Sequence, residues 1–169
     1  MASPFRFDRT WHFGVTPEEL WATLARTDCY RDWWPWLRTF ELDEPAGDGA
    51  DPLRSGATAQ LVIQAPLPYQ LRCTVSVDDA LPERRLATHV DGDLTGPARL
   101  ELVPAGAGTD ARLAWELELR APMLRALARV ARPAMAWAHD RIVERGLVQF
   151  EGHALDGRAD PRGAREPDA

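Results

Sequence analysis

The side chains best suited to acid–base chemistry are histidines, and one of the four lies where a pocket could form. His139 falls one helical turn from both Met135 and Ile142, at the edge of an apolar stripe near the C-terminus. Histidine titrates near neutral pH and can both accept and give a proton. We therefore predict that His139 is a catalytic or ligand-contacting residue, with a partly buried structural histidine as the alternative. His12 and His89 alternate with core-facing positions and are expected outside the pocket.

A second group of candidates follows from alternation along the strands. Leu113, Trp115 and Leu117 share the face of a strand that we expect to point inward. Alternate residues on the neighbouring strands should point to the same inner face of the sheet. That set is Tyr69, Leu71, Cys73, Val75, Thr88, Val90, Ala98, Leu100 and Leu102. Thr88 and Ala98 are small, so they leave a void that either a ligand or helical side chains could fill. Tyr69 is the inward polar residue that we predict to contact a ligand, because its hydroxyl needs a partner when buried.

Three tryptophans surround one proline in the segment WWPW, at Trp33, Trp34 and Trp36. Their rings could line a site for a flat, ring-shaped ligand, or simply plug one end of the fold. Packing is the favoured interpretation for Trp33, and both interpretations stay open for the other two. The predicted ligand-contacting residues are therefore Trp34, Trp36, Tyr69, Leu71, Cys73, Thr88, Val90, Ala98, Leu100, Trp115, Met135, His139 and Ile142.

The sequence predicts no metal and no cofactor. It has no HxxxH, HExxH or paired-cysteine spacing, no GxSxG elbow, no P-loop and no dinucleotide fingerprint. His89, Asp91 and Asp93 form an acidic cluster, but a solvated turn explains it. All 20 basic residues are arginine, which excludes lysine chemistry and is typical of a GC-rich bacterial genome.

Composition indicates one globular domain in a reducing compartment. The chain has 169 residues, 45% of them apolar and 27% charged, which is enough to bury a core. Its net charge of −6 gives no reason to expect nucleic-acid binding. Two cysteines outside any CxxC motif, and the lack of a signal peptide or an apolar run of spanning length, predict a cytoplasmic protein without a membrane span.

Periodicity gives the elements that would position these residues. A strand is expected over Phe5–Phe13, then a helix from Pro17 to about Asp28 that begins with the capping box Thr16–Glu19, then a short helix near the tryptophans. Further strands are expected at Arg38–Leu42, Ala57–Gln64, Tyr69–Val77, Arg84–Asp91, Pro97–Val103 and Arg112–Arg120, with loops at Asp43–Ser55 and Gly92–Gly96.

The C-terminal part changes to a helical period. Because Pro133 interrupts it, we expect a short helix up to Arg132 and a main helix from Pro133 to about Ala154. Residues 1–155 then form the domain, and the charged Asp156–Ala169 is expected to be a disordered tail. A run of antiparallel strands bracketed by helices predicts an α+β fold, with a curved sheet of six to seven strands around the long C-terminal helix.

Several segments resemble the polyketide cyclase/dehydrase-like family of START-like proteins, the SRPBCC superfamily with the helix-grip fold. These are TPEELWATLARTDCYRDWWPWLR (Thr16–Arg38), LPYQL (Leu67–Leu71), GDLTGPARLEL (Gly92–Leu102) and ARPAMAWAHDRIVERGL (Ala131–Leu147). The resemblance covers about Phe5 to Leu155 and implies a cavity for a small hydrophobic or aromatic molecule.

For function, the resemblance implies two hypotheses. One is an enzyme that cyclises or dehydrates a polyketide-like carbonyl compound, for which His139 or Tyr69 would supply the acid–base group. The other is a carrier or sensor of a lipid or aromatic molecule, which requires only the cavity.

Overall fold

The computed structural model describes residues 5–43, 51–64 and 69–155, which build one seven-stranded antiparallel sheet and its helices. In chain order the elements are β1 (Phe5–Phe13), α1 (Pro17–Leu24), the short 3₁₀ helix η1 (Thr27–Cys29), α2 (Tyr30–Trp33), β2 (Leu37–Leu42), β3 (Thr58–Gln64), β4 (Gln70–Leu81), β5 (Arg85–Gly92), β6 (Leu94–Ala105), β7 (Gly108–Leu119) and α3 (Pro122–His153). The strand order is β1-β7-β6-β5-β4-β3-β2, so the first strand closes onto the last.

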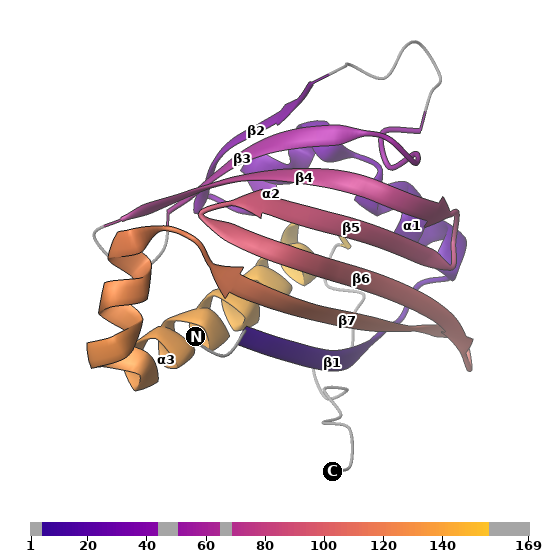
Figure 1. Cartoon of the computed structure of the whole chain (residues 1–169). Helices are drawn as coiled ribbons and strands as arrows, with labels where there is room; N and C mark the ends of the chain where they lie inside the picture. The colour runs from indigo at the N-terminus through magenta and orange to yellow at the C-terminus, as the bar shows by residue number, and fades with distance from the viewer. Residues whose placement is uncertain (1–4, 44–50, 65–68, 156–169) are drawn as a thin grey trace.

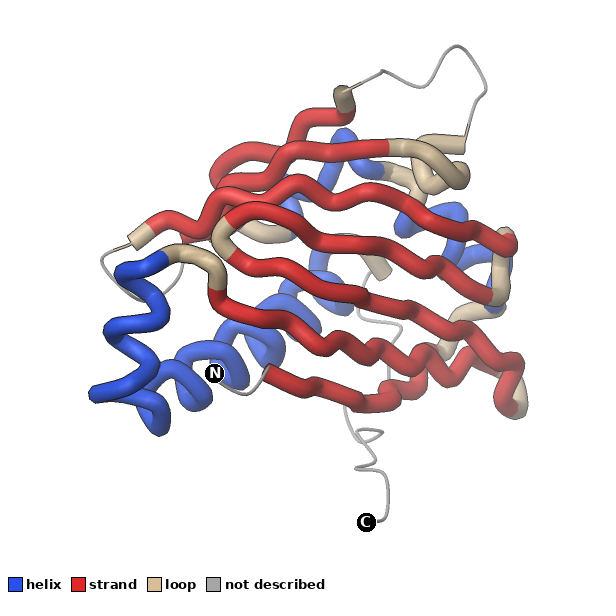
Figure 2. Tube along the Cα trace, viewed as in Figure 1, coloured by secondary structure: helices blue, strands red, loops and turns tan. Residues whose placement is uncertain are grey.

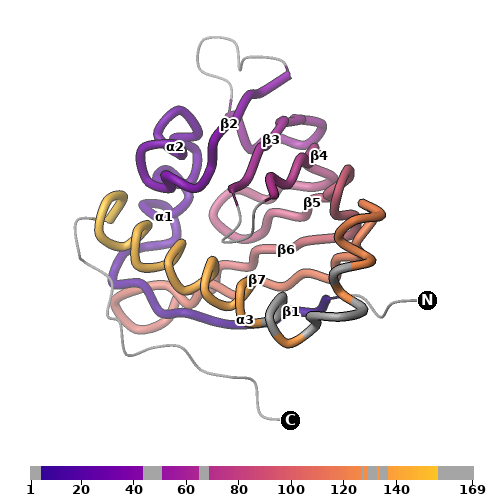
Figure 3. The backbone as a smooth tube through the Cα atoms, turned by 90° about the vertical axis from the view of Figure 1, so that its left-hand side faces the viewer, coloured from indigo at the N-terminus to yellow at the C-terminus, as the bar shows by residue number. Residues whose placement is uncertain are grey.

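The sheet is strongly curved and the helices gather on its concave side. Figure 1 shows α1, α2 and most of α3 behind the strands, and Figure 2 shows the same separation of strands from helices. In the side view of Figure 3 the long helix α3 lies across the inside of the curved sheet, with α1 and α2 at one end. This is the predicted helix-grip arrangement, and the space between the sheet and α3 is where a cavity can form.

The first helix begins as predicted and ends earlier. The side chain of Thr16 accepts a hydrogen bond from the backbone N–H of Glu19, and the Glu19 carboxylate accepts one from the Thr16 N–H, which completes the capping box. The helix stops at Leu24 and not near Asp28. At this end the Tyr30 hydroxyl donates to the free Leu24 carbonyl at 2.6 Å, so a tertiary contact replaces the next helical turn.

Strand register confirms that the predicted inward residues share a face. Thr88 lies opposite Ala98, Ala98 lies opposite Trp115, and Trp115 lies opposite Phe7. These cross-strand neighbours form a continuous row over β5, β6, β7 and β1 on the side that faces the helices.

Three strands run further than the sequence pattern predicts, and one of them, β7, begins at Gly108 and not at Arg112. Strand β4 continues past Val77 because a bulge at Asp78 breaks the alternation without ending the pairing. Strand β6 starts at Leu94 and includes Gly96, whose backbone lies so close to the Glu116 carbonyl that a Cβ atom would collide with it. The expected Gly92–Gly96 loop is therefore wrong, and only Asp93 lies between β5 and β6.

The C-terminal region is one helix, not the two that were expected. Helix α3 runs continuously from Pro122 to His153 with Pro133 in its interior. Figure 1 shows that its first turns point in a different direction from the rest, which fits the loss of one backbone hydrogen bond at a proline. The predicted tail Asp156–Ala169, and residues 44–50 of the predicted Asp43–Ser55 loop, lie outside the described residues.

The core lies at the end of the sheet near α1 and α2. Trp33 is only 4% exposed and packs edge-on against Phe150 of α3, which supports its interpretation as a packing residue. Trp11, Phe13, Leu20 and further apolar side chains belong to the same cluster. This cluster fixes α1 and the C-terminal half of α3 relative to the sheet.

Candidate functional site

An apolar cavity of about 390 Å³ lies between the inner face of the sheet and α3. Its lining comes from every layer of the fold: Trp11, Phe13, Leu20, Leu24, Trp34, Trp36, Leu86, Thr88, Ala98, Arg99, Leu100, Leu102, Ala111, Leu113, Trp115, Ile142, Val143, Gly146, Leu147 and Phe150. The volume falls within the usual range for small-molecule sites, about 300–1,000 Å³. The cavity is therefore the candidate functional site.

Two tryptophans join α3 to the start of β2 and form one wall of the cavity. The Trp34 indole N–H donates to the Gly146 carbonyl at 2.8 Å, and the Trp36 indole N–H donates to Gln149 Oε1 at 3.0 Å. The hydrogen-bonding needs of both indoles are thus met by α3. Their rings are 6.0 Å apart and present fixed apolar surface to a ligand.

The sheet side of the cavity owes its space to small residues. Ala98 lies between Thr88 and Trp115 in the register of β5, β6 and β7. The Thr88 hydroxyl donates to the Ala98 carbonyl at 3.3 Å, so its hydrogen bond is already used inside the sheet. A ligand would contact methyl groups here. A larger side chain at position 98 would occupy the space that the ligand needs.

His139 lies beside Trp115 and Phe7, and it is not among the residues that line the cavity. Its ring meets both aromatic rings edge-on, with centroids 5.3 Å from Trp115 and 5.4 Å from Phe7. His139 Nδ1 is 3.3 Å from Asp140 Oδ1, whereas its buried Nε2 has no partner. The buried indole nitrogen of Trp115 also has none.

Tyr69 lies before β4, and its hydroxyl donates to Asp93 Oδ2 at 3.0 Å. The same carboxylate oxygen accepts the backbone N–H of Arg72 at 2.8 Å. The hydrogen bond to Asp93 raises the pKa of the Tyr69 phenol, so the hydroxyl stays protonated. Tyr69 is not a lining residue of the cavity.

Of all the predicted ligand contacts, some line the cavity and others lie outside it. Trp34, Trp36, Thr88, Ala98, Leu100, Trp115 and Ile142 line the cavity, whereas Leu71, Cys73 and Val90 do not. Burial raises the pKa of the Cys73 thiol, which keeps it protonated. The side chain of Met135 lies outside the described residues.

Several lining residues were not among the predicted contacts. Trp11 and Phe13 belong to the first strand, whose pairing with β7 brings them opposite Ala111 and Thr109. Their alternation was visible in the sequence, but their closeness to the last strand was not. Gly146 has no side chain that could have marked it as a lining residue, and a Cβ atom there would lie in van der Waals contact with Trp36, 3.4 Å from its Cζ2.

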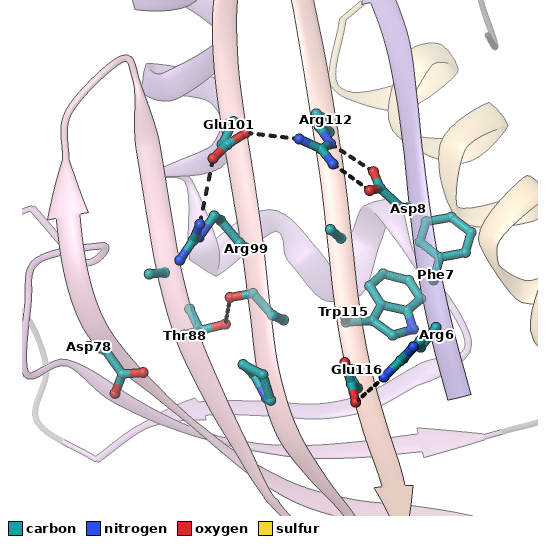
Figure 4. Close-up of a pocket in the computed structure, with 14 residues that line it drawn as sticks. Arg6, Phe7, Asp8, Asp78, Thr88, Arg99, Glu101, Arg112, Trp115 and Glu116 are labelled. Carbon is teal, nitrogen blue, oxygen red and sulfur yellow. Dashed lines mark hydrogen bonds and ion pairs between the residues drawn. The ribbon is translucent and has the colours of Figure 1, made fainter. Parts of the chain in front are cut away.

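A second hollow, of about 640 Å³, lies on the opposite face of the sheet (Figure 4). Charged side chains surround it, and most of them pair with one another. Arg112 donates to Asp8 at 2.8 Å and lies 3.7 Å from Glu101, and Arg6 pairs with Glu116 at 3.1 Å. The Arg112 guanidinium lowers the pKa of the Asp8 carboxyl. Because most of these charges are already paired, the hollow offers less to a ligand than the apolar cavity does.

The described residues hold no cluster of three or more potential metal ligands. Within the same part of the chain, no helix combines the length and apolar character needed to cross a bilayer.

Comparisons with known proteins agree with this architecture. The model of the family described as polyketide cyclase/dehydrase and lipid transport matches residues 4–154. None of the curated proteins matches the chain.

Among solved structures, the Zhui aromatase/cyclase from Streptomyces sp. R1128 is 17% identical, with a TM-score of 0.70 over 95% of this chain and 99% of that one. A START superfamily protein from Mycobacterium smegmatis is 16% identical, with a TM-score of 0.67 over 89% and 97% of the two chains. A conserved protein from Geobacillus kaustophilus is 11% identical, with a TM-score of 0.68 over 90% and 97%. At these identities the likeness concerns the fold.

Proposed function

Because the chain belongs to the polyketide cyclase/dehydrase and lipid transport family, we propose that it binds a small, largely apolar organic molecule between the sheet and α3. The observation that carries this proposal is the apolar cavity of about 390 Å³, closed on one side by Trp34 and Trp36. Burying an apolar ligand there gains roughly 25 cal/mol per Å² of surface removed from water.

The lining favours a compact ring compound. Trp34 and Trp36 offer flat surfaces, and Ala98 and Gly146 leave room beside them. Arg99 is the one charged residue in this described lining. Its guanidinium lies 3.8 Å from the carboxylate of Glu101, and both residues also line the hollow on the outer face of the sheet. The site therefore selects mainly by shape and apolar contact, in the cytoplasm where the sequence predicts the protein to act.

The second candidate function is catalytic cyclisation or dehydration of a polyketide-like carbonyl compound. Its support is the family and one structural feature, the unpartnered Nε2 of His139 beside the cavity-lining Trp115. The Tyr69 hydroxyl is held by Asp93, so the catalytic hypothesis depends on His139. A carrier needs the cavity alone, which makes binding the better-supported proposal.

A matched pair of substitutions tests the binding proposal. Ala98→Leu fills the cavity from β6, whereas Ala87→Leu adds the same atoms to the hollow on the outer face. Quenching of tryptophan fluorescence by a panel of polycyclic and fatty ligands measures affinity. We expect Ala98→Leu to weaken binding at least about tenfold and Ala87→Leu to leave it unchanged. Wild-type protein that binds no member of the panel, or equal binding by both variants, would contradict the proposal.

Catalysis is tested separately from binding. Wild type and His139→Ala would each be incubated with a polyketide-like ketone that the protein binds, and the products analysed by mass spectrometry. A product formed by wild type and lost in His139→Ala, with ligand affinity retained, would support the enzyme. Unchanged ligand in both samples supports the carrier.

A further inference from the structure

The apolar cavity ends at one row of residues across the sheet. Thr88 on β5, Ala98 on β6 and Trp115 on β7 lie opposite one another, and each is the last lining residue on its strand in the direction away from α1. The next residues on the same face of these strands do not line the cavity, and they are Val90, Gly96 and Leu117. Three neighbouring strands therefore leave the cavity at the same level.

The helix side of the cavity ends at this level too. The described lining residues of α3 are Ile142, Val143, Gly146, Leu147 and Phe150. His139 precedes Ile142 by three residues and Val143 by four, so it occupies the next position on this face of the helix. Its ring packs edge-on against Trp115, with centroids 5.3 Å apart, and it is not a lining residue.

Three rings close this end of the cavity. Trp115 stacks on Phe7 of β1 at a centroid distance of 4.3 Å (Figure 4), and His139 meets Phe7 edge-on at 5.4 Å. The Nε1 atom of Trp115 and the Nε2 atom of His139 are buried, so water does not reach the contact between the two rings. Phe7, Trp115 and His139 thus form a continuous aromatic wall from β1 and β7 to α3.

The aromatic wall limits the length of the cavity. On β7 the lining extends from Ala111 to Trp115, which is about 14 Å at the usual rise of a strand. On α3 it extends from Ile142 to Phe150, which is about 12 Å at the rise of a helix. An extended chain advances roughly 1.2 Å per bond, so a sixteen-carbon chain is about 18 Å long. Such a chain does not fit between α1 and the aromatic wall.

We propose that the aromatic wall sets the length of the ligand, with Trp115 and His139 as specificity-determining residues. The cavity then binds compact ring compounds and chains of about ten carbons, and it excludes the long acyl chains of membrane lipids. This inference rests on the proposed function, because it names the size class of the molecule that the cavity binds.

The test uses straight-chain primary alcohols from hexanol to hexadecanol. Their affinities would be measured by displacement of the apolar fluorescent probe N-phenyl-1-naphthylamine from wild type, Trp115→Ala and His139→Ala. Trp137→Ala is the matched control, because Trp137 is 62% exposed on α3. Each further CH₂ group that is buried should raise the affinity about fourfold, whereas one that stays in water should add nothing.

In wild type and Trp137→Ala we expect the affinity to rise with chain length up to about ten carbons and then to level off. In Trp115→Ala and His139→Ala the rise should continue for at least two further carbons, because truncation of either ring opens the wall. Hexadecanol should gain at least about tenfold in affinity relative to decanol in these variants. A purely structural role of the two rings would change the affinities of all alcohols alike and would not move the chain length at which the rise stops.

The wild-type series tests the inference even if the variants do not fold. A wild-type affinity that keeps rising up to hexadecanol, or a rise that stops at the same chain length in both wall variants, overturns the inference and leaves the proposed function standing. Wild-type protein that binds neither the fluorescent probe nor any alcohol overturns the proposed function as well.

Discussion

The indole nitrogen of Trp34 donates a hydrogen bond to the carbonyl oxygen of Gly146, 2.8 Å away, and so joins the segment before β2 to the C-terminal half of α3. A Cβ atom on Gly146 would lie 3.4 Å from Cζ2 of Trp36. A Cβ atom would therefore fit here in ordinary contact, whereas a longer side chain would have to extend among both tryptophans and the cavity.

A larger residue at Gly146 should occupy the ligand's place. We expect Gly146→Leu to weaken binding of an apolar probe at least about tenfold, because the side chain would lie among Trp34, Trp36 and the cavity. Gly152→Leu is the matched control, since a side chain there meets nothing within 4 Å and should gain roughly 0.8 kcal/mol of helix propensity. Fluorescence titration measures affinity and urea unfolding measures stability. Equal affinity in the two variants would mean that this wall does not bound the site.

The Trp34 hydrogen bond should contribute measurably to stability. Trp34→Phe keeps an aromatic ring but removes the donor, so we expect the free energy of unfolding to fall by about 1 kcal/mol from the lost hydrogen bond, plus a term for lost packing. Trp137→Phe is the control because Trp137 is 62% exposed on α3, the helix that Trp34 contacts. Urea denaturation of both variants provides the comparison, and a Trp34→Phe midpoint no lower than that of Trp137→Phe would contradict this role.

Tyr30 should give the protein a stability term that is lost at alkaline pH. Burial raises the pKa of the Tyr30 phenol, with the Asp51 carboxylate adding to the effect. Since the folded-state pKa lies above the unfolded value of about 10, the stabilisation is complete below that pH and declines as pH rises past it. Stability measured from about pH 8 to pH 11 should fall less steeply in Tyr30→Phe than in wild type.

The same substitution has a second consequence at neutral pH. Tyr30→Phe removes the 2.6 Å hydrogen bond to the Leu24 carbonyl and should cost about 1 kcal/mol. Identical pH profiles for the two proteins would show that the Tyr30 phenol ionises as readily when folded as when unfolded.

The capping box at the start of α1 should affect stability without affecting ligand affinity. Thr16→Ala removes the acceptor for the Glu19 N–H, which typically costs about 1 kcal/mol. Thr16→Asn keeps a capping oxygen and should stay within a few tenths of a kcal/mol of wild type. Thermal unfolding distinguishes the two. A large loss of ligand affinity in Thr16→Ala would show that α1, through Leu20 and Leu24, controls the cavity more directly than expected.

The sequence predicted helix and strand bounds well where neighbouring residues alone determine them. The alternation of Phe5 to Phe13 predicted β1 with its correct bounds, and the Thr16–Glu19 box predicted the start of α1. The end of α1 was not predictable in this way, because a tertiary hydrogen bond from Tyr30 decides it. The bulge at Asp78 extends β4 past the point where alternation stops.

In the candidate site, too, features set by local sequence were predicted and features set by tertiary contacts were not. Strand parity correctly predicted that Thr88, Ala98, Leu100 and Trp115 share the inner face, and all four line the cavity. Parity alone does not tell how far along a strand the cavity reaches, so Leu71, Cys73 and Val90 were chosen by face but lie beyond the lining. The contribution of Trp11 and Phe13 depends on the pairing of β1 with β7, which no local pattern specifies. The roles of His139 and Tyr69 in catalysis stay predictions.

Native mass spectrometry of the intact protein with added ligand tests the central claim most directly. Wild type and Ala87→Leu should each retain one molecule of an apolar ring compound, and solvent extraction of protein purified from its own host should identify such a compound. Ala98→Leu, which fills the cavity from within, should not retain it. Wild-type protein that purifies empty and retains no ligand from a broad apolar panel would contradict the account, because the tryptophans at the cavity wall would then serve packing alone.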